Sequence, residues 1–123
     1  MIGKLTVIIP THERHHVLRR AISYYSQINV SVLIVDSSLK FFDEGLPKNI
    51  QYIHLLSSFF GDKIYSALCQ VDTPYSCLCA DDDFLSESGL YFGIRYLEEN
   101  KEYVSIQGNY VHFSYSENLN DYH

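Results

Sequence analysis

Short apolar runs rich in β-branched residues alternate along this chain with apolar stripes at helical spacing. The runs are residues 5–9, 30–35, 50–55 and 76–80, with a further one around Val104 and Ile106. The helical stripes lie at residues 17–25, 64–71 and 90–97. Because the runs are continuously apolar, they predict strands of a sheet that is covered on both faces. We therefore expect an α/β fold with an open, mostly parallel sheet flanked by helices.

Length, charge and cysteine content narrow the class of protein. A chain of 123 residues fits one domain, which we expect over residues 1–113, with a polar tail at 114–123. The net charge of −6 argues against a nucleic-acid partner. No apolar run approaches the ~20 residues of a membrane span, and no export signal is visible, which predicts a cytoplasmic location. The three cysteines, Cys69, Cys77 and Cys79, are an odd number, so we expect reduced, mostly buried thiols.

Polar groups follow three of the apolar runs directly, at residues 11–16, 36–38 and 81–83. If the strands are parallel, all three groups lie along one rim of the sheet, where such folds bind ligands. The last group is Asp81-Asp82-Asp83, and adjacent carboxylates after a buried strand need a compensating cation. Oxygen ligands in a loop suit Mg²⁺ or Mn²⁺, which keep positions open for phosphates. A solvated acidic turn is the alternative, but apolar residues flank this turn on both sides.

The turn after the first run excludes two familiar phosphate sites. Residues 10–14 contain no glycine, so neither a dinucleotide fingerprint nor a P-loop stands there. Residues 12–16 match H-E-x-x-H by letter. However, they follow Pro10-Thr11 at an expected helix start, whereas a zinc-protease motif lies within a helix. We interpret the match as accidental. An intermediate interpretation places His12, Arg14 or His15 near a ligand bound at the rim.

Three segments, in this order, resemble the nucleotide-sugar half of family-2 glycosyltransferases with the GT-A fold. They are residues 7–11, 33–38 and 73–83, and the resemblance covers most of residues 4–108. It implies a truncated GT-A (nucleotide-diphospho-sugar transferase-like) domain. Such a domain binds a nucleotide-sugar donor, with a UDP-sugar expected, through a divalent metal. It would transfer the sugar to an acceptor that the sequence does not identify.

The resemblance also implies roles for single residues. The expected nucleotide-sugar-binding residues are Pro10, Thr11, Arg14, Asp36, Lys63, Asp81 and Asp82, and the expected metal ligands are Asp82 and Asp83. Asp36 would recognise the base and Asp81 the ribose, although three consecutive aspartates leave the register ambiguous by one residue. For Asp36, a role as a cap of the following turn is equally open. The bound Mn²⁺ or Mg²⁺ would stabilise the departing diphosphate as a Lewis acid.

The family pattern is incomplete in this chain. Family members continue into an acceptor-binding half, which in inverting enzymes carries the catalytic base, and nothing marks Glu117 or Asp121 as such a base. We therefore assign no catalytic residue. Two alternatives to a complete transferase stay open: a donor-binding fragment of a longer enzyme, and a non-catalytic nucleotide-sugar-binding module. Apolar surface that the missing half would cover makes self-association an expectation.

Overall fold

The computed structural model describes residues 2–114, and the expected tail therefore lies almost wholly outside the described residues. Four strands form one parallel sheet in the order β3-β2-β1-β4. The strands are β1 (Leu5–Thr11), β2 (Ser31–Asp36), β3 (Ile50–His54) and β4 (Tyr75–Leu78). The expected α/β architecture with an open parallel sheet is confirmed.

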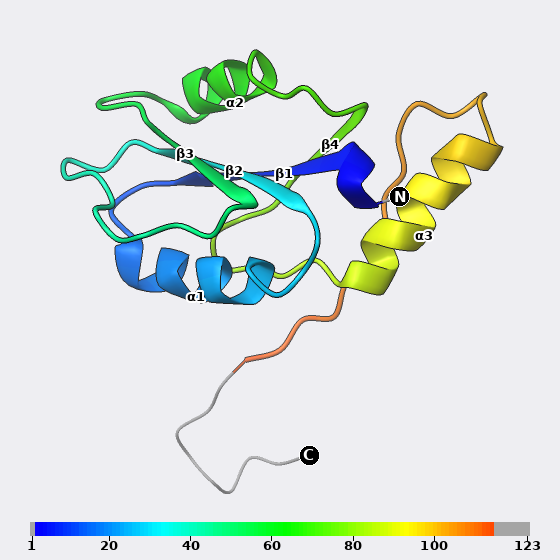
Figure 1. The fold of residues 1–123 in the computed structure, drawn as a ribbon, viewed down its shortest axis with the longest axis horizontal. Coiled ribbons are helices and arrows are strands. Elements are labelled where there is room, and N and C mark those ends of the chain that lie inside the picture. The colour runs from blue at the N-terminus through cyan, green and yellow to red at the C-terminus, as the bar shows by residue number, and fades with distance from the viewer. Residues whose placement is uncertain (1, 115–123) are drawn as a thin grey trace, which may run out of the picture.

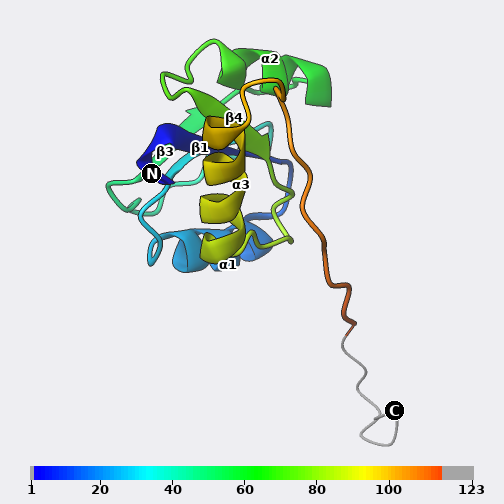
Figure 2. The same cartoon turned by 90° about the vertical axis from the view of Figure 1, so that its right-hand side faces the viewer.

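Helices cover both faces of this sheet. Helix α1 (His15–Tyr25) lies on one face and α2 (Phe60–Leu68) on the other, as Figure 1 shows. Helix α3 (Glu87–Glu99) stands beyond β4, beside the short 3-10 helix η1 (Ile2–Lys4), which the view in Figure 2 makes clear. Ser86 caps α3 by accepting a hydrogen bond from the Gly89 backbone N–H at 3.1 Å, as expected for a serine at that position.

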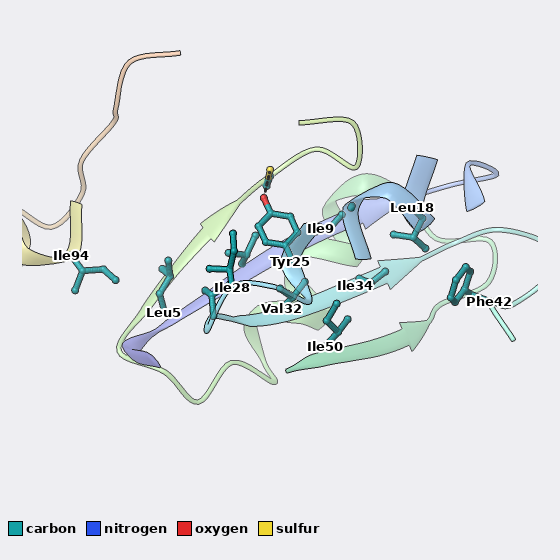
Figure 3. Close-up of a cluster of buried hydrophobic side chains, with 14 residues drawn as sticks. Leu5, Ile9, Leu18, Tyr25, Ile28, Val32, Ile34, Phe42, Ile50 and Ile94 are labelled. Atoms are coloured by element: carbon teal, nitrogen blue, oxygen red, sulfur yellow. Dashed lines mark hydrogen bonds between the residues drawn. The ribbon is translucent and has the colours of Figure 1, made fainter. Parts of the chain in front are cut away.

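Alternate residues of the central strands pack against opposite helices. The α1 side of the core holds Val7, Ile9, Val32 and Ile34 with Leu18, Ala21 and Tyr25 (Figure 3). The α2 side holds Ile8, Leu33 and Val35 with Ala67. Each fully buried valine, leucine or isoleucine side chain among them contributes about 1.5–3 kcal/mol of transfer free energy. The continuous apolar runs are thus explained, because both faces of the sheet lie against helices.

Three details differ from the sequence-based expectations. Strand β1 does not end before Pro10 but continues to Thr11. The pairing of β1 with β4 ends earlier, at Ile8 and Leu78, so no residue of β4 needs a hydrogen bond from the missing N–H of Pro10. No strand includes Val104 or Ile106 within residues 2–114, and Val104 is 95% exposed. Cys69 is exposed, whereas Cys79 is buried and Cys77 is half-buried.

The topology brings the polar strand ends together. The chain runs from β1 outward to β2 and β3, then crosses the sheet through α2 to β4 on the other side of β1. The order of strands therefore reverses between β1 and β4, where open α/β sheets bind ligands at the carboxyl ends. Within the part of the chain that the structure describes, no helix is long and apolar enough to span a membrane.

Candidate functional site

The ends of β1, β2 and β4 meet at one rim of the sheet. Thr11 at the end of β1 pairs with Asp36 at the end of β2. On its other side, the Thr11 hydroxyl donates a hydrogen bond to Asp81 Oδ2 at 2.7 Å. The polar groups that the sequence places after three separate strands are therefore neighbours in the fold.

The acidic turn after β4 contains carboxylates in two different environments. Asp81 is buried, with 5% of its side chain exposed, whereas Asp82 is half-exposed and Asp83 is exposed. Arg14, the residue before α1, contacts two of them, with Nη1 at 2.9 Å from Asp81 Oδ1 and Nη2 at 3.1 Å from Asp82 Oδ2. The hydrogen bond to Asp82 and the charge of Asp81 raise the pKa of Arg14. The chain thus supplies part of the compensating charge itself.

A divalent metal fits this turn only together with further ligands. No group of three or more His, Cys, Asp or Glu side chains gathers for a metal among residues 2–114. Asp82 and Asp83 are exposed carboxylates on the same turn, in which the Asp83 N–H donates to the Ala80 carbonyl at 3.2 Å. Mg²⁺ and Mn²⁺ are commonly held by one or two carboxylates, with phosphate oxygens and water completing the shell. The two carboxylates of Asp82 and Asp83 therefore suit a metal ion whose remaining ligands are phosphate oxygens and water.

Asp36 lies fully buried at the centre of a hydrogen-bond network. Its Oδ1 accepts from the backbone N–H and the hydroxyl of Ser38, and its Oδ2 accepts from Tyr52 and His15, each at 2.7 Å. Burial opposes ionisation of Asp36, but these hydrogen bonds outweigh it and hold its pKa below the usual value. Asp36 therefore caps the turn that follows β2, as one of the two interpretations of the sequence expected. Direct contact with a base would require one donor to leave.

Lys63 forms hydrogen bonds with residues at the ends of both β1 and β2, from the face of the sheet that α2 covers. It lies on α2, is 6% exposed, and donates from Nζ to the Thr11 carbonyl at 3.0 Å and to Ser37 Oγ at 2.9 Å. Burial lowers the pKa of Lys63, and the nearby charges of Asp36 and Asp81 offset part of this effect. In this geometry Lys63 fixes the two strand ends relative to each other.

We expect the substitution Lys63→Met to lower the free energy of unfolding by about 1–3 kcal/mol, because it removes the ammonium that bonds two buried oxygens. Urea denaturation followed by circular dichroism measures this loss. Lys48→Met is the matched control, because Lys48 is exposed and its ammonium makes no hydrogen bond within residues 2–114. Equal stabilities of the two variants would contradict the joining role.

The loops after β1 and β2 are bonded to each other above the rim. The Glu13 backbone N–H donates to Ser38 Oγ at 2.7 Å, and His12 Nδ1 lies 3.0 Å from Ser37 Oγ. Glu13 holds a φ of 52°, a left-handed conformation that these bonds stabilise. His12 precedes α1, so the H-E-x-x-H letters do not lie within one helix, in keeping with an accidental match.

The same loops border a hollow of about 340 Å³. Its lining residues are Glu13, His15, His16, Leu39 and Lys40. His15 is the lining residue that also contacts Asp36. The hollow therefore lies next to the rim, at the first turn of α1.

The sequence indicated most of the residues that meet at the rim. Pro10, Thr11, Asp36 and Asp81 lie at the strand ends, with Arg14 bridging to the acidic turn and Lys63 beneath. Tyr52 was missed, and so were the cross-loop bonds of Ser37 and Ser38. The available signal for Tyr52 was its place in the middle of a strand, where a half-buried phenol hydroxyl needs a polar partner.

Comparison with known proteins adds one finding about the fold. No family model matches the sequence, and no curated protein resembles it at a significant level. Solved structures do share the fold. One is a crystal structure of residues 1–349 of TarS from S. aureus, a glycosyltransferase, with a TM-score of 0.59 and 17% sequence identity. The match covers 77% of this chain and 32% of the TarS chain. The chain therefore shares its fold with part of that TarS chain and spans about a third of its length.

Proposed function

We propose that this chain is the donor-binding part of a glycosyltransferase and binds a nucleoside-diphosphate sugar, with a UDP-sugar expected, at the rim described above. One observation carries the proposal: Thr11, Asp81, Arg14 and Asp82 form a continuous chain of polar contacts where the strand order reverses. The glycosyltransferase-like fold supports it.

In this proposal the diphosphate lies at the acidic turn. Asp82 and Asp83 would hold Mn²⁺ or Mg²⁺ together with the phosphate oxygens, and Asp81 would orient Arg14 and the ribose. The metal, when bound, would supply Lewis-acid stabilisation of the departing diphosphate. Arg14 adds a second positive charge beside the same oxygens, and its planar guanidinium suits phosphate. Pro10 and Thr11 would contact the nucleoside, and the hydrogen bond from Lys63 to the Thr11 carbonyl would hold these two residues in position.

The base would lie on the Asp36 side of the rim, because Thr11 separates Asp36 from Asp81 in the sheet register. No described residue is assigned as general base, so the role proposed for this chain is donor binding rather than the transfer step itself. A donor-binding module without transferase activity is the second candidate, because none of residues 2–114 is assigned as a general base. Release of a sugar from a UDP-sugar by this chain alone separates the two candidates.

Calorimetric titration with UDP tests the binding function. We expect affinity in the presence of Mn²⁺ to exceed affinity in excess EDTA by at least about tenfold, because two carboxylates repel an unneutralised diphosphate. The double variant Asp82→Asn, Asp83→Asn should lose this metal dependence. Equal affinity of the unmodified chain with metal and with chelator would rule out metal-assisted binding.

A further inference from the structure

The acidic turn after β4 leaves one of its three carboxylates to be placed by the backbone alone. Within residues 2–114, Asp81 bonds Thr11 and Arg14, and Asp82 bonds Arg14. The Asp83 carboxylate forms no hydrogen bond or ion pair with any of these described residues. Its position therefore depends on how the main chain of the turn is held.

A short run of hydrogen bonds connects the main chain at Asp83 to the last turn of α1. Cys79, which follows β4 directly, donates from its thiol to the Asp83 carbonyl oxygen, 3.5 Å from Sγ. Because that bond uses the thiol proton, the Tyr25 hydroxyl donates to Cys79 Sγ, at 3.3 Å (Figure 3). The Tyr25 oxygen in turn accepts the Leu85 backbone N–H at 3.1 Å. One phenol and one thiol thus hold the main chain at Asp83 and at Leu85.

Burial makes this run of hydrogen bonds persistent. Tyr25 is fully buried and Cys79 is 5% exposed, so water does not replace a lost partner at either group. Burial also raises the pKa of Tyr25, so its hydroxyl keeps the proton that it donates. Tyr24, the preceding residue of α1, adds a bond from its hydroxyl to the Leu85 carbonyl at 2.9 Å. Because an unpaired polar group at this depth is costly, the turn stays bonded to α1.

We propose that Tyr25 and Cys79 are joint positioning residues for Asp83, which they hold where its carboxylate can bind the divalent metal. This inference rests on the proposed function, and it names what sets the geometry of one metal ligand. Mg²⁺ requires oxygen ligands at about 2.0–2.1 Å in near-octahedral geometry, so a small shift of the main chain weakens binding. Asp82 is less sensitive to such a shift, because its bond to Arg14 also limits its movement.

Calorimetric titration with UDP, in Mn²⁺ and in excess EDTA, measures the metal-dependent part of the affinity as the ratio of the two dissociation constants. Tyr25→Phe keeps the ring in the core but removes the hydroxyl, and should lower this ratio by about five- to tenfold, the size of one hydrogen bond. The affinity in EDTA should stay unchanged, because the Asp81 side chain keeps its bonds to Thr11 and Arg14.

Tyr75→Phe is the matched control. It also removes one tyrosine hydroxyl bond, from Tyr75 to Glu98 Oε1 at 2.7 Å, but at the opposite end of β4 from the acidic turn. We expect this variant to keep the metal dependence of the unmodified chain. Hydrogen exchange gives a readout without any ligand, because the Leu85 amide should exchange faster in Tyr25→Phe but not in Tyr75→Phe.

Cys79→Ala tests the second member of the pair and remains informative if Tyr25→Phe does not fold. It should lower the metal-dependent ratio as Tyr25→Phe does. The double variant should lose no more than either single variant, because both side chains belong to one run of bonds.

Each outcome decides the inference. An unchanged ratio in Tyr25→Phe or in Cys79→Ala, or an equal loss in Tyr75→Phe, overturns the positioning role and leaves the proposed donor site standing. Losses that add in the double variant overturn the joint action of the two side chains. Absence of metal dependence in the unmodified chain overturns the inference together with metal-assisted binding.

Discussion

Replacing Asp36 with asparagine should lower the free energy of unfolding by about 2–4 kcal/mol at neutral pH. The Asp36 carboxylate accepts four hydrogen bonds. Asparagine has the same shape, but its NH₂ group is a donor and would face hydrogen-bond donors that have lost their acceptor. The loss is large compared with the ~5–15 kcal/mol that stabilises a typical domain. Urea denaturation at several pH values measures it.

The pH dependence identifies the charge of Asp36 as the cause. Folding lowers the pKa of Asp36 below its unfolded value of 3.8, so its stabilisation is complete above that value and is lost as the pH falls through the folded value. The difference between the unmodified chain and Asp36→Asn should therefore be constant from about pH 7 to pH 5 and shrink below about pH 4. A difference that stays constant into acid would mean that shape, and not charge, explains the loss. Asp72→Asn, at an exposed position, is the control.

Replacing Asp81 with asparagine should weaken UDP binding in Mn²⁺ by at least about tenfold. Thr11 can still donate to the remaining amide oxygen, but the amide N–H₂ repels the Arg14 guanidinium. Of its two acidic partners among residues 2–114, Arg14 then keeps the half-exposed Asp82, and exposed ion pairs hold side chains weakly. Calorimetry with UDP measures the change, and circular dichroism checks that the variant is folded.

The control again is Asp72→Asn, which lies in the loop that leads into β4, at the opposite end of the sheet from the rim. It should bind UDP as the unmodified chain does. If Asp81→Asn is folded and also binds normally, Asp81 plays no part in the donor site. Weakened binding in both variants would point to overall charge rather than to the acidic turn.

The sequence was sufficient for the order of elements and for the location of the rim. Runs such as residues 30–35 are apolar at every position but one because both faces of the sheet are covered, and that signal is local. The residues around Val104 and Ile106 show the limit of the same reasoning. Their β-branched side chains favour a strand, but a strand needs a partner, and local sequence does not report whether one is present.

The site was predictable in its residue types but not in its contacts. Parallel strands place Thr11, Asp36 and Asp81 at one rim, as expected from the position of each residue after an apolar run. The bond of His15 to Asp36, by contrast, depends on how α1 is rotated over the sheet. The position of Lys63 beneath Thr11 depends likewise on the packing of α2. Such contacts depend on tertiary packing, and no hydrophobic periodicity in the sequence predicts them.

Helix α1 connects the rim to the interior of the protein. Its first turn and the preceding residue carry His15 and Arg14, while Leu18, Ala21 and Tyr25 along its length fill the larger apolar cluster. The same helix therefore carries residues of the proposed binding site and residues of the core. On heating, we expect the binding site and the core to unfold together. A bound nucleotide should consequently raise the melting temperature of the whole domain, by an amount that grows with its concentration relative to its dissociation constant.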